Sequence, residues 1–260
     1  MKELINIFST YSKKISAKAQ FREKIIKYFF VINGFAALMI MLLIFLFLLK
    51  EGYHAFEQIS LTDFVYKEKL TGGSQTKIYE WYPTSDEPRY SIIPLLIGTL
   101  LTAVPATIIS TIFGIAVGIY LSEIASIKLR EILKPVIELF AGIPTVVIGF
   151  FMLAVGATIF SDFFNPVNRL NSILAAIGLS FIIIPVIASL TEDAIRAVPN
   201  DLRMGSYALG ATRWQTIRKV ILPTAISGLT AGIILGFGRA LGETMIVLMA
   251  SGNAAELTFD

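Results

Sequence analysis

Two charged residues, Arg239 and Glu243, interrupt an otherwise uncharged stretch from Pro223 to Ala250. On a helix with about 3.6 residues per turn, and with Gly228 set at zero, Arg239 lies at ~20° and Glu243 at ~60°. Two kinds of chemistry fit that spacing. The two residues could form an ion pair that neutralises itself, or the arginine could attract an anion while the glutamate holds it in place.

Glycines share the helix face of these charges. Gly232 lies at ~40° and Gly236 at ~80° on the same projection, and small residues of this kind let helices approach closely. A charge at the centre of a membrane costs about 2.5–3.5 kcal/mol, so neither charge should face lipid. The face is therefore predicted to pack on protein or to line a pathway. Glu138, near the cytoplasmic side, is a weaker candidate for the same pathway.

The composition is that of an integral membrane protein. Of 260 residues, 55% are hydrophobic and 16% are charged, whereas soluble domains carry about 25% charged residues. A helix needs about 20 apolar residues to cross the hydrocarbon core. The sequence predicts an all-α membrane protein with five spans, at about 27–49, 92–120, 135–160, 171–190 and 223–250.

The distribution of Lys and Arg orients these spans, because cytoplasmic segments carry the excess of both. It predicts a basic cytoplasmic N-terminus at 1–27 and a first transmembrane helix at 28–49. An external insert of mixed structure follows at 50–91, and a core at 92–260 includes a basic cytoplasmic loop at about 192–222. Five spans would leave the last residue outside, so a sixth, returning helix is expected beyond it.

The basic loop has the signals of two short helices joined at a corner. Pro199 starts the first helix, and Gly210 ends it. Thr212 can cap the second helix, and Pro223 marks a bend. As a purely physical pattern, the loop also fits an interfacial helix whose cations meet lipid phosphates.

The same loop resembles the signature loop of ABC-importer permease subunits. The family pattern is a Glu-Ala-Ala triplet, then a glycine, then Ile-x-Leu-Pro. Gly210 and Val220-Ile221-Leu222-Pro223 match that pattern, and Met204-Gly205-Ser206 departs from it, with methionine where the family has an acid. The stretches "IELFAGIPTVVIGF", "TEDAIRAVPNDLR" and "GRALGETMIVLMASGN" are similar, in this order, to PstC-type permeases of bacterial phosphate importers.

The resemblance implies a type I ABC-importer permease fold in a prokaryotic plasma (inner) membrane. It implies ATP-driven uptake of inorganic phosphate, with sulfate or molybdate as alternative anions, and it favours the pathway role for Arg239 and Glu243. The implied partners are a PstA-like second permease, two PstB-like ATPases, an external PstS-like binding protein and membrane lipid, with no nucleic acid. The residues that it assigns to ATPase docking are Ser206, Ala208, Leu209, Gly210, Ala211, Thr212 and Trp214.

The chain lacks the common catalytic and cofactor motifs. It has no GxxxxGK[ST] loop to cradle ATP, no GxSxG elbow, no HExxH pair, and a single histidine, His54. No catalytic residue, metal site or cofactor is therefore predicted in this chain, and ATP hydrolysis is left to partner chains. An intramembrane enzyme and a plain ion channel are the alternatives from other classes.

Overall fold

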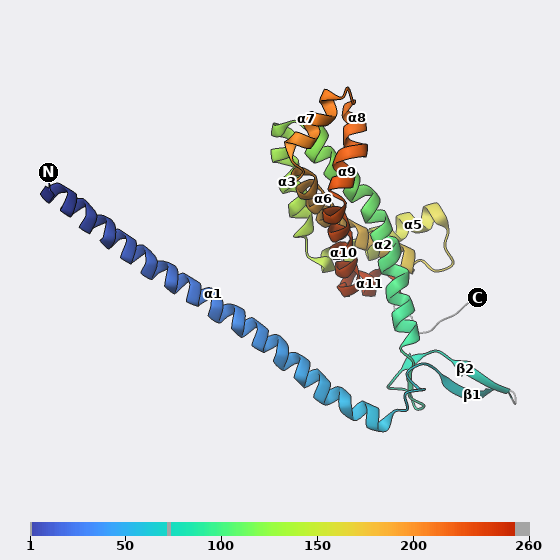
Figure 1. Cartoon of the computed structure of the whole chain (residues 1–260). Helices are drawn as coiled ribbons and strands as arrows, with labels where there is room; N and C mark the ends of the chain where they lie inside the picture. The colour runs from blue at the N-terminus through green and yellow to red at the C-terminus, as the bar shows by residue number, and fades with distance from the viewer. Residues whose placement is uncertain (1, 72–73, 253–260) are drawn as a thin grey trace. The chain divides into compact units, whose positions relative to one another are not determined.

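The protein is predominantly helical and divides into two compact units, Met1–Asp63 and Phe64–Asp260. The end of the predicted core, 253–260, and the side chain of His54 lie outside what the structure describes. A computed structural model describes the backbone of residues 2–71 and 74–252, and the side-chain surroundings of 19–53, 59–68 and 77–252 (Figure 1).

The first unit is one long helix, α1, which runs from Lys2 to Gln58. Its segment Ala19–Tyr53 is long and apolar enough to cross a membrane, with a mean hydropathy of 2.7. Large apolar side chains are exposed around its whole circumference, which suits a helix in contact with lipid. The helix extends past both ends of the predicted span, so the beginning of the predicted insert is helical.

The second unit begins with two small antiparallel sheets, within the segment where the sequence predicts an insert of mixed structure. Lys67 pairs with Ile78 in one sheet, and Trp81 pairs with Tyr90 in the other. Ser91 Oγ donates to the carbonyl of Val65 at 2.6 Å and fixes the start of the next helix to the sheets. The strands are β1 (Lys67–Thr71), β2 (Ser74–Ile78), β3 (Trp81–Tyr82) and β4 (Arg89–Tyr90).

Two long helices form the centre of the second unit (Figure 1). Helix α2 (Ile93–Ile119) continues into a π-helical segment, η1 (Tyr120–Ile124), and packs along α6 (Ser172–Arg196). A Cβ added at Gly118 would lie 2.6 Å from the Cβ of Thr191, so the two backbones meet at near-contact distance. A small residue thus lets the two helices approach closely at this crossing. Buried around it are Ala103, Ala106, Ala176, Leu179, Ile182, Ile183, Ile187, Ala240 and Ile246.

The predicted span at 135–160 is wrong in its boundaries. Helix α3 (Ile127–Ala141) ends, and a new helix starts at Thr145. Pro144 lies in the break and has an extended ψ of 130°. A proline also disfavours helical backbone in the residue before it, here Ile143. The apolar span is Thr145–Phe164. It consists of α4 (Thr145–Phe151), a π-helical segment η2 (Met152–Gly156) and α5 (Ala157–Phe164).

The basic loop folds as its local signals predict. Gly210 has a φ of +79°, a value that favours glycine. The Thr212 side chain accepts from the backbone of Gln215 in a capping box, and this starts the second helix. The elements of the loop are α7 (Asn200–Ala208), α8 (Arg213–Thr216), the π-helical segment η3 (Ile217–Ile221) and α9 (Leu222–Thr224).

The predicted span at 223–250 is not one helix. Helix α10 (Ile226–Gly242) ends at Glu243, whose ψ of 125° is extended, and α11 (Met245–Ala250) follows. The segment Arg213–Thr224 is bent by 69° relative to α10. Within the described residues the structure thus has four helices that could each cross a membrane, and a fifth span if this bent pair is counted as one.

Candidate functional site

The corner between α7 and α8 exposes apolar side chains. Leu209 is 90% exposed and Trp214 is 61% exposed. Beside them lies an open groove of about 540 Å³. A corner that presents a leucine and a tryptophan to the outside of the chain fits a docking surface for another protein. Residues lining the groove include Leu202, Ser206, Leu209, Gly210, Lys219 and Val220.

The residues predicted for ATPase docking lie together on this corner. Ala208, Gly210 and Thr212 are exposed and Ala211 is half-buried. Ser206 turns inward, where its hydroxyl lies 2.9 Å from the hydroxyl of the buried Thr216 and joins α7 to α8. The role of these residues in docking stays a prediction.

Arg239 does not pair with Glu243, although both were predicted to lie on one helix face. The Arg239 guanidinium donates to the carbonyl of Ala141 at 3.2 Å. Glu243 lies after the end of α10, and its carboxylate accepts from the backbone N–H groups of Met245 at 3.0 Å and Ile246 at 3.4 Å. Among the described contacts there is no ion pair between the two charges. Each side chain bonds to backbone groups instead, so the self-neutralising pair is not formed in this structure.

Arg239 connects the two places where the helices are interrupted, after α3 and after α10. Its side chain comes from the last turn of α10, and Ala141 is the last residue of α3, immediately before the second break. A Cβ added at Gly149 of α4 would lie 2.9 Å from the sulfur of Met249, so α11 packs closely on α4. Glu138 is exposed on α3, one turn before Ala141, and no described contact joins it to Arg239. Three glycines of α10, Gly228, Gly232 and Gly236, pack on α6; a Cβ at Gly236, for example, would lie 2.9 Å from Ile183.

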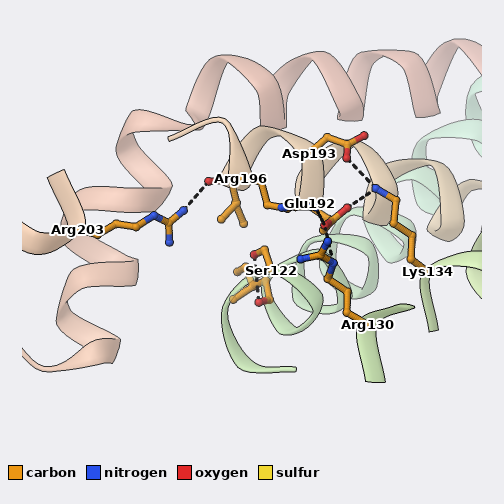
Figure 2. A network of polar contacts seen from close by, with 9 residues as sticks. Ser122, Arg130, Lys134, Glu192, Asp193, Arg196 and Arg203 are labelled. Atoms are coloured by element: carbon orange, nitrogen blue, oxygen red, sulfur yellow. Dashed lines mark hydrogen bonds and ion pairs between the residues drawn. The ribbon is translucent and has the colours of Figure 1, made fainter. Parts of the chain in front are cut away.

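The largest cluster of charges was not predicted from the sequence. The carboxylate of Glu192, near the end of α6, is 0% exposed and faces three cations from two helices (Figure 2). Arg130 lies 3.4 Å away, Arg196 lies 3.5 Å away, and Lys134 donates a short hydrogen bond. The sequence does carry a signal for this cluster: Glu192 follows 20 residues without charge in α6, at a depth where a lone acid would be costly.

Lys134 joins this cluster to the surface. It bonds to Glu192 and, at 2.8 Å, to the exposed Asp193. Burial lowers the pKa of Lys134, but the hydrogen bonds to Asp193 and Glu192 outweigh it and hold that pKa above its ordinary value. The ammonium group therefore stays charged throughout the neutral range, and the cluster carries three cations and two carboxylates.

A second buried ion pair connects the basic loop to the core. Arg203 of α7 pairs with Glu123 of η1, and the two side chains are 16% and 6% exposed. The other arm of the Arg203 guanidinium donates to the carbonyl of Ile195 at 2.7 Å, at the end of α6. One side chain thus joins three elements. No group of three or more His, Cys, Asp or Glu residues in the described part of the chain could hold a metal ion.

Comparison with known proteins identifies the family. Residues 114–258 match the family described as the inner membrane component of binding-protein-dependent transport systems. The chain belongs to this family. The resemblance read from the sequence is thereby confirmed, as is the helical permease fold class.

Relatives within the family include two bacterial permeases. The probable ABC transporter permease protein YqgH of Bacillus subtilis is 41% identical over 177 residues, which are 68% of this chain and 57% of the relative. The phosphate transport system permease protein PstC of Haemophilus influenzae is 34% identical over 208 residues, 73% of this chain and 65% of the relative. The chain thus spans less than two thirds of the length of these relatives. An inward-facing structure of the MetNI methionine ABC transporter aligns with 58% of this chain and 72% of its own, at 26% identity and a TM-score of 0.48.

Proposed function

We propose that this chain is a permease subunit of an ATP-driven importer of inorganic phosphate. The observation that carries the proposal is the exposed corner at Leu209 and Trp214, built on a loop with the family's signature spacing. A separate ATPase subunit docks on this corner, and its closure on ATP drives the permease between two conformations. Phosphate is favoured over sulfate or molybdate because sequence relatives such as PstC of Haemophilus influenzae are named as phosphate transport permeases.

The complete importer contains a second, similar permease chain, two ATPase chains and an external binding protein that delivers the anion. It resides in the inner membrane of a prokaryote. Uptake of labelled phosphate into proteoliposomes tests the assignment directly. We expect uptake that requires both ATP and the ATPase subunits, and that excess sulfate does not suppress. Phosphate uptake without the ATPase subunits would indicate a channel. Suppression of uptake by sulfate would indicate that sulfate, rather than phosphate alone, is a substrate.

We place Arg239 in the substrate pathway, with Glu243 as the residue that holds the neighbouring break in shape. Arg239 is exposed on this chain, and its guanidinium donates one hydrogen bond to the Ala141 carbonyl. Its other N–H donors can therefore bind an anion. Its position at two broken helices fits the way transporters build substrate sites from discontinuous spans. Glu138, on the cytoplasmic approach along α3, is the weaker member of the pathway.

An Arg239→Gln variant should assemble and hydrolyse ATP, but its phosphate uptake should fall by at least about tenfold, because a hydrogen bond to a charged group contributes about 1.5–3 kcal/mol. The measurement is initial uptake rate together with ATP hydrolysis in the same vesicles. Arg169→Gln is the matched control, since Arg169 is also a cation, lies between α5 and α6, and donates to the Thr158 hydroxyl of α5 at 2.6 Å. Equal uptake by the two variants would remove Arg239 from the pathway.

We propose that the N-terminus and the basic loop face the cytoplasm, while the insert at 50–91 faces outward. The support is the excess of Lys and Arg in the first two segments. The chain has no cysteine, so each introduced cysteine is a unique label. In right-side-out vesicles, Thr84→Cys should react with an impermeant thiol reagent at once. Gln20→Cys and Met204→Cys should react only after the membrane is opened, and the reverse pattern would invert the topology.

A further inference from the structure

Helix α7 is held in place by polar contacts rather than by buried apolar side chains. None of its residues is buried, so packing alone does not fix its position. The apolar cluster beneath the loop contains no residue of α7. That cluster joins η3 and α10 to the end of α6, and Ile115 and Ile119 of α2 pack against it. Its buried members are Ile195, Val198, Ile217, Ile221, Ala225 and Leu229.

Two side chains of α7 reach inward. Ser206 meets Thr216 and thereby ties α7 to α8 within the loop. Arg203, one turn earlier, bonds to Glu123 of η1 and to the Ile195 carbonyl of α6. Figure 2 shows Arg203 extended from the loop toward the end of α6. Arg203 is thus the polar connection, among the described contacts, from α7 to the two central helices.

The chemistry of this connection makes it stiff. A guanidinium is planar, always charged, and presents its donors in a fixed fork. Here the fork bonds to two acceptors on different elements, and both charged side chains are largely removed from solvent. A charge pair at such a depth is screened little by salt. A displacement of α7 therefore has to move η1 and α6 with it, or break a shielded ion pair.

We infer that Arg203 is a positioning residue that transmits movement of the docking corner to α2 and α6, with Glu123 as its anchor. The inference rests on the proposed function, since it needs an ATPase that moves the corner. The continuous chain through α8, η3 and α9 carries movement to α10. The chain also continues from α6 into α7 through residues 197–199, and the Arg203 bridge adds a polar link from α7 to both α6 and η1, so that the spans change position together.

The test measures a conformational change in the helical core rather than phosphate uptake. In the complete importer, built with cysteine-free partners, Thr244→Cys gives a single reporter. Thr244 is exposed, makes no capping bond, and lies at the break after α10. The rate at which a water-soluble maleimide labels it is measured with and without ATP. We expect ATP to change this rate by about fivefold or more, the lower end of couplings between distant sites.

Arg203→Ala should abolish most of that ATP effect while the complex assembles and hydrolyses ATP. Glu123→Ala should have the same consequence, and the double variant should be no worse than either single one, because both remove one link. Arg203→Lys should restore part of the effect. Arg218→Ala is the matched control: it removes the same charge from an exposed side chain of η3 and should leave the ATP effect intact.

A full ATP effect in assembled Arg203→Ala would overturn the inference. If that variant does not assemble, Glu123→Gln decides, because it keeps the shape of the side chain and removes the charge; a full ATP effect there overturns the inference too. A failure of the proposed function has a different signature. An unaltered importer that responds to ATP but takes up no phosphate has another substrate, and one whose labelling ignores ATP is not an ATP-driven importer.

Discussion

Glu192→Ala should lower the free energy of unfolding by about 3–5 kcal/mol, the usual loss when one partner of a buried ion pair is removed. The carboxylate is 0% exposed, and its removal leaves Arg130, Lys134 and Arg196 facing one another without a counter-charge in the interior of the cluster. Because these cations come from α3 and α6, the first consequence should be separation of the two helices. The midpoint of thermal unfolding in detergent measures the loss.

Asp193→Ala is the matched control for that variant. Asp193 is the next residue, carries the same charge and bonds to the same Lys134 at 2.8 Å, but its side chain is 58% exposed. Exposed ion pairs contribute at most about 1 kcal/mol, so this variant should unfold close to the unaltered chain. Equal losses in the two variants would mean that burial of the carboxylate is not the source of the effect.

Gly118→Ala should lower the free energy of unfolding by about 1–3 kcal/mol, the usual cost of overpacking a filled interior. The added Cβ would lie 2.6 Å from two carbons of Thr191 and 2.9 Å from the carbonyl oxygen of Ala188. The backbone of α6 cannot rotate away from this contact as a long side chain could. The helices α2 and α6 must therefore move apart, and the same unfolding midpoint detects it.

Gly98→Ala, in the same helix, is the control that separates the effect of packing on α6 from the effect of replacing a glycine within a helix. A Cβ at Gly98 would meet nothing within 4 Å, and alanine favours a helix over glycine by about 1 kcal/mol. This variant should be neutral or slightly stabilised. If it were destabilised as strongly as Gly118→Ala, the loss would have to come from the helix itself or from partner chains rather than from the crossing with α6.

The parts of the fold set by local chemistry were predictable from the sequence. The corner at Gly210 and the cap at Thr212 depend on neighbours within a few residues, and both have the predicted geometry. The breaks at 142–144 and at Glu243 were missed, because apolar composition identifies a span but does not say whether its backbone stays helical. A proline inside α2, Pro105, leaves that helix continuous, so proline alone could not have located the breaks.

The candidate site was predictable only in part. The helical projection placed Arg239 and Glu243 on one face, but it could not show that each side chain bonds to backbone groups rather than to the other. The buried charge clusters join positions far apart along the chain, such as Arg203 with Glu123 and Lys134 with Glu192. Each residue looks like an ordinary cytoplasmic charge, and only the folded chain selects its partner.

The π-helical segments are places inside helices where this chain could lose one residue without a change of helix face. A π turn holds one residue more than an α turn, since its hydrogen bonds reach one residue further. Deleting one residue within η2, such as the exposed Ala154, would convert that turn to α-helix and leave α4 and α5 on their present faces. The same deletion in the middle of α6 would rotate everything beyond it by about 100°. A one-residue deletion at a π segment can therefore leave the buried helix crossings of this permease in register.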